Sequence, residues 1–379
     1  MKILVCSPIP LDPKLGAAKV ILEVTECMNR QGEDCRLVSD TDVCPGVAGF
    51  HGVRRMVEYS HALREFLRRN AHDYDVVDYD HVYLPYSRET FERRVLFVAR
   101  SVLLAQHFDR IPLPHFRRLR SRIGTWVKGP IRLVERKFTS MRADRTCAQA
   151  DLINVSNDAD RVELLRRGIA GEKIVVIPFG LTRERLAQFG AIPEAIPPGP
   201  PRVAFVGTFD ARKGGAELPE IVERVARVVP EVKFKLLGAR YRSEGETLAF
   251  FPERLHRHLE LVSQFAPDDL PRLLSDCWAG IFPSHVEGFG FGVLEMLAAA
   301  LPVVAYDAPG PPMMLPPKYL ARRGDVRELA SMLSRLLADP SHLASARLWA
   351  RNRAADFQWE SFARMTADSY TAGIERVRR

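Results

Sequence analysis

The sequence predicts an α/β protein built from two domains, and three observations support this prediction. Strand, helix and strand patterns follow one another at residues 2–6, 17–30 and 35–38, as in a parallel sheet covered by helices. A second succession of this kind begins at residue 202. A proline- and glycine-rich segment, IPEAIPPGPP, separates the two halves at residues 192–201. The chain of 379 residues is long enough for two full cores.

The composition excludes several classes of protein. Hydrophobic residues make up 46% and charged residues 27% of the chain, which is ordinary for a globular protein in water. The opening MKILVCSP is a short apolar stretch followed at once by proline, so it predicts a buried strand rather than a signal peptide. The six cysteines form no C-x-x-C pair. We therefore expect reduced thiols, a cytoplasmic protein and no metal site.

The net charge of +8 is concentrated in residues 110–145, which contain eleven Lys/Arg and two acidic residues. Apolar and aromatic residues interleave with these charges, which is typical of a helix that lies on anionic lipid. We expect this segment to bind the inner face of the membrane, or to pack on its own domain with a solvated basic face. We expect no nucleic-acid binding, because no recognised nucleic-acid module accompanies the charge.

Polar residues follow a predicted buried strand in the first half. Residues 53–70 predict a helix and residues 75–77 a strand, and the next residues are Asp78-Tyr79-Asp80-His81. Ligands of α/β sheets bind beyond the carboxyl ends of the strands. Asp80 and His81 are therefore candidate ligand-binding residues of the first half. The alternative is that they are simply polar residues of a loop. Further strands are expected at 95–99, 151–156 and 173–178, and a helix at 159–167.

The second half opens with a strand at residues 202–206 and the loop GTFDARKG. Arg212 and Lys213 in this loop can clamp a diphosphate, lysine as a point charge and arginine as a fork. The alternative is that both are merely exposed cations at a helix start, although helix N-termini disfavour positive charge. A helix at 217–228 and strands at 233–237 and 259–262 follow.

Residues 281–305, IFPSHVEGFGFGVLEMLAAALPVVA, predict a strand, a glycine-rich loop, a helix from residue 293 and a second strand. Glu287 lies in the loop and Glu295 lies early in the helix, so both carboxylates can face one site. The loop amides and the helix N-terminus favour an anion. Such a site suits a ligand with negative charge and hydroxyl groups, such as a nucleotide sugar. The alternative is that the glycines only make a tight turn.

The pattern SHVEGFG, followed by Leu-Glu at 294–295 and LPVV at 301–304, is similar to that of retaining GT-B glycosyltransferases, closest to glycosyltransferase family 4. The resemblance implies two Rossmann-like domains facing across a cleft. It implies an acceptor domain at 1–191, a linker at 192–201, a donor domain at 202–356, and a C-terminal helix at 357–379 that returns to the first domain.

The resemblance also implies roles for individual residues. Glu287 would contact the donor sugar beside the reacting carbon, and Glu295 would hold the ribose hydroxyls. Phe265 would form a wall of the base pocket. The backbone amides of Phe289, Gly290 and Phe291 would approach the diphosphate together with Arg212 and Lys213.

The chain departs from the family pattern at several positions. In the family, a Gly-Gly pair in the loop after the first strand approaches the donor diphosphate, and this chain keeps only one glycine of the pair, Gly16. The alternative is that this segment is a plain loop with no part in binding. Thr208 replaces an arginine, so Arg212 would supply the second cation. Val102 replaces a histidine, for which His107 is a candidate substitute. Ala300 stands where glycine is usual, and this predicts a different end for the preceding helix.

The resemblance implies a retaining glycosyltransferase. We expect a nucleotide-diphospho-sugar donor, with UDP or GDP as the nucleotide, and no metal or other cofactor. The acceptor would be a lipid-linked or cell-envelope glycan or a small molecule, with Glu287 and His81 as catalytic residues. One alternative is a nucleotide-sugar epimerase, which needs acid and base groups such as Asp80, His81 or His107. The other is a non-catalytic binding scaffold.

Overall fold

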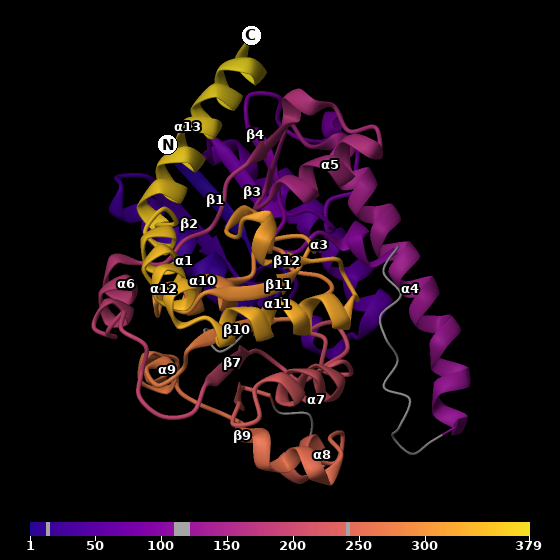
Figure 1. The fold of residues 1–379 in the computed structure, drawn as a ribbon. Coiled ribbons are helices and arrows are strands. Elements are labelled where there is room, and N and C mark those ends of the chain that lie inside the picture. Colours follow the sequence, from indigo (N-terminus) through magenta and orange to yellow (C-terminus); the bar gives the residue numbers. More distant parts are fainter. Residues whose placement is uncertain (13–15, 110–121, 240–242) are drawn as a thin grey trace. The chain divides into compact units, whose positions relative to one another are not determined.

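The computed structural model describes residues 1–12, 16–109, 122–239 and 243–379, and only the backbone of residues 16 and 122–132. The described chain divides into two compact units. The first unit holds residues 1–109, 122–179 and 359–379, and the second holds residues 180–358. Figure 1 follows the chain by colour through both units.

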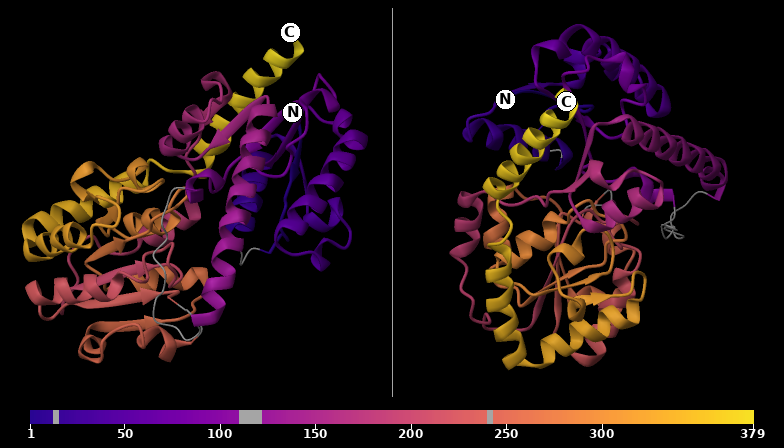
Figure 2. Two further views of the ribbon diagram at one scale, coloured as in Figure 1. Left: turned by 90° about the vertical axis from the view of Figure 1, so that its right-hand side faces the viewer. Right: turned by 90° about the horizontal axis from the view of Figure 1, so that it is seen from above.

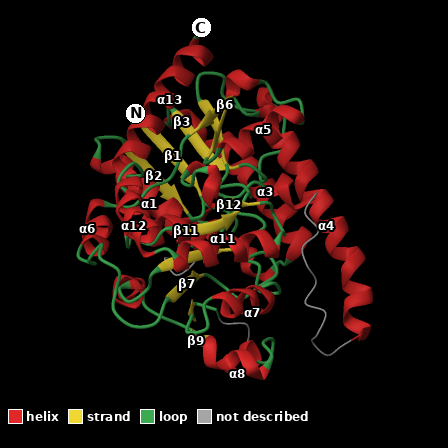
Figure 3. Cartoon of the chain, viewed as in Figure 1, coloured by secondary structure: helices red, strands yellow, loops and turns green. Residues whose placement is uncertain are grey.

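The first unit is built around a parallel sheet of six strands in the order β2-β1-β3-β4-β5-β6. Figure 3 shows helices packed around these strands. The elements are β1 (Lys2–Cys6), α1 (Gly16–Arg30), β2 (Asp34–Val38), α2 (Asp40–Val43), α3 (Gly52–Asn70), β3 (Val76–Asp80), β4 (Leu96–Arg100), α4 (Arg122–Gln149), β5 (Leu152–Val155), α5 (Asp158–Arg166), β6 (Ile174–Val176) and α13 (Trp359–Arg378).

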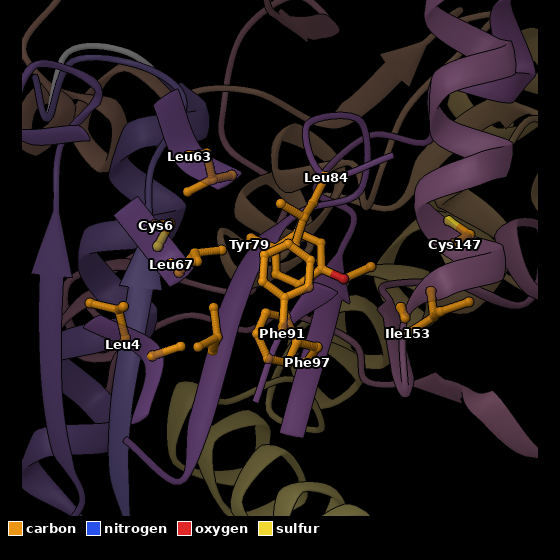
Figure 4. Packing of buried hydrophobic residues seen from close by; sticks show 14 of the residues in the cluster. Leu4, Cys6, Leu63, Leu67, Tyr79, Leu84, Phe91, Phe97, Cys147 and Ile153 are labelled. Carbon is orange, nitrogen blue, oxygen red and sulfur yellow. The ribbon is translucent and has the colours of Figure 1, made fainter. Parts of the chain in front are cut away.

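One face of this sheet packs against α3, α4 and α5, because alternate strand residues point to the same side. Figure 4 shows this core. The rings of Phe91 and Phe97 stack at 4.9 Å, and the ring of Tyr79 lies 6.2 Å from that of Phe97. Leu63 and Leu67 of α3 belong to the same buried cluster. The helix predicted at residues 53–70 is therefore confirmed, and Leu63 and Leu67 lie on its buried face.

The opposite face of the sheet contains a buried polar group instead. Strand β3 continues through Asp80, so the prediction that Asp78 and Asp80 lie in the following loop was wrong. Asp78 is buried within the sheet, where its carboxylate accepts a hydrogen bond from Arg100 Nε at 2.8 Å and one from the hydroxyl of Tyr370. These partners satisfy the carboxylate, and an acidic residue can therefore extend a buried strand.

The second unit contains another parallel six-stranded sheet, in the order β12-β11-β10-β7-β8-β9. Figure 2 gives two further views of its elements. They are α6 (Arg183–Gly190), β7 (Arg202–Val206), α7 (Leu218–Val228), β8 (Lys233–Leu237), α8 (Glu244–Leu248), β9 (Leu259–Val262), α9 (Leu270–Leu274), β10 (Ala279–Phe282), α10 (Phe291–Ala298), β11 (Val303–Tyr306), β12 (Leu320–Ala321), α11 (Val326–Ala338) and α12 (Pro340–Ala354).

The proline-rich segment at residues 192–201 is bound to this second unit. Arg347 is fully buried and donates to the carbonyls of Pro193 and Glu194, at 3.2 and 2.8 Å. Trp278 Nε1 donates to the carbonyl of Pro197 at 3.1 Å. The compact units divide before residue 180, whereas the linker predicted at 192–201 is held by side chains of one unit.

Candidate functional site

The candidate site lies where the sheet of the second unit reverses its strand order. Strand β7 pairs with β8 on one side and with β10 on the other. The loops that follow β7 and β10 therefore leave the sheet next to each other, at the position where α/β sheets bind ligands. Glycine allows their contact: at Gly214, with φ of +76°, an added Cβ would lie 2.2 Å from the carbonyl oxygen of Pro283.

Two cations and a carboxylate meet between these loops. Lys213 Nζ lies 2.6 Å from Glu287 Oε1, and Arg212 Nη1 lies 3.2 Å from the same oxygen. The Glu287 side chain is only 9% exposed and that of Lys213 is 15% exposed. Arg212 Nη1 also donates to the carbonyl of Val286 at 3.3 Å. The structure thus brings together three predicted site residues, while their roles in binding and catalysis stay predictions.

The loop after β7 is shaped by Asp210. One oxygen of its carboxylate accepts the backbone N–H of Lys213 at 3.0 Å, and the other accepts the hydroxyl of Thr208 at 2.6 Å. Thr208 therefore supports the loop at the position where the resembling family has an arginine. The second cation beside Glu287 is Arg212, in agreement with its place in the sequence-based hypothesis.

A buried hydrogen-bonded group fixes the loop after β10. Glu217 accepts from His285 Nε2 at 2.9 Å and from the Tyr306 hydroxyl at 2.6 Å. Burial and the Glu217 charge both raise the pKa of the Tyr306 hydroxyl, which stays protonated and donating. The backbone N–H of His285 donates to the carbonyl of Arg212 at 2.8 Å. This connection ties the Glu287 loop to the Arg212 loop.

Helix α10 starts two residues earlier than predicted. Gly290 is its N-cap with φ of +94°, a conformation that favours glycine, and Phe291 is its first residue. The side chain of Phe289 is buried and packs on the rings of Phe291 and Phe357. The predicted contribution of Phe289 to an anion site can therefore come only from its backbone.

The other end of α10 contradicts our expectation. Ala300 has φ of +58°, and its N–H and that of Leu301 bond back to Leu297 and Met296. The helix thus ends in the usual left-handed turn despite the alanine. The hydrogen bonds of this turn and the burial of the alanine methyl offset its backbone cost.

Glu295 lies in α10 beside a residue that the sequence patterns did not indicate. Arg185 of α6 has Nη2 at 3.6 Å from Glu295 Oε1, and the same nitrogen donates to the carbonyl of Pro267 at 2.7 Å. Phe265 lies two residues before Pro267, and its ring packs against Gly238. A Cβ added at Gly238 would lie 3.4 Å from this ring. Arg185 therefore connects the predicted ribose-binding carboxylate to the segment that carries the predicted base wall.

In the first unit, His81 lies at the carboxyl end of β3. Its Nε2 accepts the backbone N–H of Ala105 at 3.1 Å, and its Nδ1 lies 3.6 Å from Asp80 Oδ1. Burial raises the pKa of the Asp80 carboxyl, and the nearby His81 opposes this shift. A cavity of about 370 Å³ adjoins both residues. It is lined by Met56, Asp80, His81, Val82, Tyr83, Leu103, Ala105, Phe108, Glu135, Arg136 and Thr139.

The remaining predicted site residues of the first unit are His107 and Gly16. His107 Nε2 lies 2.7 Å from Oδ1 of the buried Asp160, whose pKa is raised by burial and lowered again by His107. Val102, at the place of the family histidine, is partly exposed. Gly16 is the first residue of α1, and the loop residues 13–15 before it lie outside the described part of the chain.

The predicted basic segment at residues 110–145 is described only in part. Residues 110–121 lie outside the described residues, and α4 covers the remainder. Leu133, Val134 and Met141 of α4 are 53%, 67% and 66% exposed, and Lys137 is exposed beside them. Among the described residues, no helix is both long and apolar enough to cross a membrane.

Sequence patterns missed Arg185, Glu217, His285 and Tyr306 as parts of the site. His285 lies inside the SHVEGFG pattern, but the pattern did not indicate its partner, and the other three are single polar residues outside any motif. Their partners lie far away in the chain, as for Tyr306 and Glu217, which are 89 positions apart. No local motif could have indicated these pairs.

A family model described as "Glycosyl transferases group 1" matches residues 200–339, which include both loops of the site and α10. In this segment the chain is similar to the group 1 glycosyltransferases. The match supports the predicted resemblance to group 1 glycosyltransferases, while family 4 and a retaining mechanism stay predictions.

The curated relatives of this chain are distant. It is 26% identical to the MMP alpha-(1->4)-mannosyltransferase of Mycolicibacterium hassiacum over 70% of the chain and 64% of the relative. It is 29% identical to the D-inositol 3-phosphate glycosyltransferase of Thermobispora bispora, over 48% of the chain and 46% of the relative. The chain thus spans about half to just under two thirds of these relatives.

Solved structures match the fold over nearly the whole chain. Sucrose-phosphate synthase from Thermosynechococcus elongatus matches with a TM-score of 0.71 and 19% identity, covering 98% of this chain and 99% of that one. Anabaena Alr3699/HepE in complex with UDP matches with a TM-score of 0.68 and 16% identity, covering 98% and 100%. Together with the two parallel six-stranded sheets, these matches confirm the prediction of a GT-B α/β fold.

Proposed function

We propose that this protein transfers a sugar from a nucleotide-diphospho-sugar to an acceptor hydroxyl, with retention of configuration at the reacting carbon. The cluster of Lys213, Arg212 and Glu287 at the strand-order switch of the second unit carries this proposal. Two cations in a partly buried site suit a diphosphate, and a carboxylate beside them suits sugar hydroxyls. A structural neighbour was solved with UDP and another form of it with UDP-glucose, which supports UDP as the nucleotide.

Each residue of the cluster has a proposed part in the reaction. Lys213 and Arg212 neutralise the charge that develops on the leaving diphosphate, and the N-terminus of α10 adds to this stabilisation. Glu287 stabilises positive charge near the anomeric carbon. Glu295, held by Arg185, binds the ribose hydroxyls. These cations would serve in place of a metal ion.

The relatives favour a transferase over the two alternatives. The curated relatives described above are a mannosyltransferase and an inositol phosphate glycosyltransferase, and neither is an epimerase or a binding scaffold. An epimerase also needs acid and base groups at the reacting sugar. Asp80, His81 and His107 are the candidates for that role, and no relative described above is named for epimerisation by such groups.

We propose that the acceptor binds in the cavity beside His81. Its lining combines apolar side chains such as Met56, Leu103 and Phe108 with the polar Asp80 and His81. This mixture suits an acceptor hydroxyl next to an apolar portion, as in a lipid-linked glycan. His81 lines this cavity beside Asp80 and would position that hydroxyl.

A screen of thermal stability tests the donor site. The wild type and the variants Lys213→Ala and Glu295→Ala are each mixed with UDP, GDP, ADP and their common sugar derivatives. A ligand at 100 times its dissociation constant adds about 2.7 kcal/mol to stability. We expect one nucleotide to raise Tm in the wild type and neither variant to respond.

The exposed Lys318, in the same unit, supplies the matched control. Lys318→Ala removes the same charge away from the site and is expected to respond as the wild type does. If no nucleotide shifts Tm in any of these proteins, the donor site is wrong. Incubation with donor alone then separates the remaining functions: slow hydrolysis supports a transferase, and interconversion of the donor sugar supports an epimerase.

We also propose that α4 binds the inner surface of a membrane with anionic lipids. Val134, Lys137 and Met141 follow one another at helical spacing and are exposed on one face. Exposed apolar side chains on a helix with basic residues favour an interface of lipid and water. A cytoplasmic protein held at this surface would meet a lipid-linked acceptor directly.

Sedimentation with vesicles tests this surface. We expect the protein to bind phosphatidylglycerol vesicles more tightly than phosphatidylcholine vesicles. The double variant Val134→Asp/Met141→Asp is expected to weaken binding by at least about tenfold, because it loses apolar burial and gains negative charge. Val162→Asp, at an equally exposed apolar residue of α5, is the control. Equal binding by the double variant and the control would contradict the proposal.

A further inference from the structure

The two cations of the candidate donor site are already paired with a carboxylate of the same site. Glu287 Oε1 lies 2.6 Å from Lys213 Nζ and 3.2 Å from Arg212 Nη1. Water screens these contacts little, since the Glu287 side chain is 9% exposed. Any phosphate that binds Lys213 and Arg212 must therefore compete with Glu287 for the same positive charge.

Glu287 has little room to move away from this position. Its Cβ lies 3.3 Å from the position of a Cβ added at Gly310, so the backbone of residue 310 packs closely behind it. Gly310 is itself held, because the same added Cβ would lie 2.6 Å from the carbonyl oxygen of Phe289. On the other side, the loop is tied to Arg212 through the backbone of His285. The backbone and Cβ of Glu287 are therefore held beside the loop that carries Arg212 and Lys213.

We propose that Glu287 also determines specificity, by disfavouring a bare nucleoside diphosphate relative to the nucleotide sugar. This inference rests on the proposed function of the site. A terminal phosphate loses its second proton near pH 6. A bare nucleoside diphosphate therefore carries additional negative charge at neutral pH, which the esterified phosphate of a nucleotide sugar lacks.

The two ligands meet Glu287 with different chemistry. The terminal phosphate of a nucleoside diphosphate places its extra charge near the carboxylate and repels it. A nucleotide sugar instead presents hydroxyl groups, which donate hydrogen bonds to the carboxylate and replace those that Lys213 gives up. The carboxylate thus weakens binding of the nucleoside diphosphate product more than binding of the nucleotide-sugar substrate. After transfer, the ion pair of Glu287 with Lys213 re-forms and favours release of the diphosphate.

Calorimetric titration of the variant Glu287→Gln tests this inference. The full-length wild type and variant are titrated with UDP, GDP, ADP and the corresponding glucose derivatives. We expect the nucleoside diphosphate to bind the variant roughly tenfold more tightly, because the competing charge is gone. The nucleotide sugar is expected to bind no more tightly than to the wild type. The ratio of the two dissociation constants is the decisive quantity.

Two further variants keep the test specific. Glu231→Gln removes the same charge at an exposed position of the same unit, and its ratio should equal that of the wild type. Glu287→Asp keeps the charge but shortens the side chain by one methylene. It should change the ratio of the two dissociation constants in the same direction as Glu287→Gln, but by a smaller factor. This second variant also serves if Glu287→Gln folds poorly.

The outcomes separate this inference from the proposed function. If Glu287→Gln tightens both kinds of ligand by the same factor, Glu287 repels anions in general and the specificity role is wrong. If the nucleoside diphosphate binds no tighter, the inference fails while the donor site stands. If neither protein binds any nucleotide, the proposed function fails and this inference fails with it.

Discussion

Replacing Asp78 with alanine is expected to lower the free energy of unfolding of the first unit by about 3–5 kcal/mol. The variant leaves the guanidinium of Arg100 buried without its counter-charge. Burial lowers the pKa of Arg100, but the charges and hydrogen bonds of Asp78 and Tyr370 together outweigh this effect and raise it. The arginine stays charged in the native protein, and its isolated charge therefore carries the full cost of burial.

The neighbouring tyrosine gives a graded comparison. The Tyr370 hydroxyl accepts from Arg100 Nη2 at 2.7 Å and donates to Asp78. Tyr370→Phe keeps the packing of α13 and is expected to cost about 1–2 kcal/mol. Glu26→Ala breaks the exposed pair with Arg30 and is expected to change stability by less than about 1 kcal/mol. Urea unfolding measures the stability of all three variants. If Asp78→Ala proves as stable as Glu26→Ala, this account of the buried ion pair is wrong.

Replacing Gly214 with alanine is expected to cost about 2–4 kcal/mol and to abolish the response to nucleotides. The new Cβ would lie 2.2 Å from the carbonyl oxygen and 2.8 Å from the Cβ of Pro283, and φ at this residue is +76°. The loops after β7 and β10 would have to separate. Lys213, the residue just before Gly214, would then move away from Glu287.

Gly324 separates the two causes of this effect. It also has a positive φ, of +81°, but an added Cβ there would meet nothing within 4 Å. Gly324→Ala therefore includes only the backbone cost, about 1 kcal/mol, and should leave nucleotide binding intact. Thermal unfolding with and without nucleotide measures both variants. Equal behaviour of the two would mean that the contact with Pro283 is unimportant.

Much of the fold followed from local sequence pattern. Hydrophobic periodicity predicted α3, α5 and α7 within about two residues, which is the usual precision of such boundaries. The succession of strand, glycine loop, helix and strand at residues 281–305 was also correct. The start of α10 was wrong because glycine fits a loop and the first turn of a helix equally well, so Gly292 did not mark the boundary.

Buried polar groups were less predictable. Asp78 belongs to β3 because Arg100 and Tyr370 surround its carboxylate, and Tyr370 is 292 positions away in the sequence. A local pattern that contains Asp78-Tyr79-Asp80 favours a loop, since unpaired carboxylates are costly inside a sheet. Only the distant partners make the strand possible.

The sequence by itself determined the α/β class, the family resemblance and the identity of the chemical groups at the candidate site: Glu287, Glu295, Lys213 and Arg212. Those conclusions depend on residue types at short spacing, which the chain order displays directly. The tertiary structure decided which groups meet. It placed both cations on Glu287, gave Glu295 its partner Arg185, and fixed the loop through Glu217. Such contacts join residues that only the packing of the sheet and its loops brings within hydrogen-bonding distance.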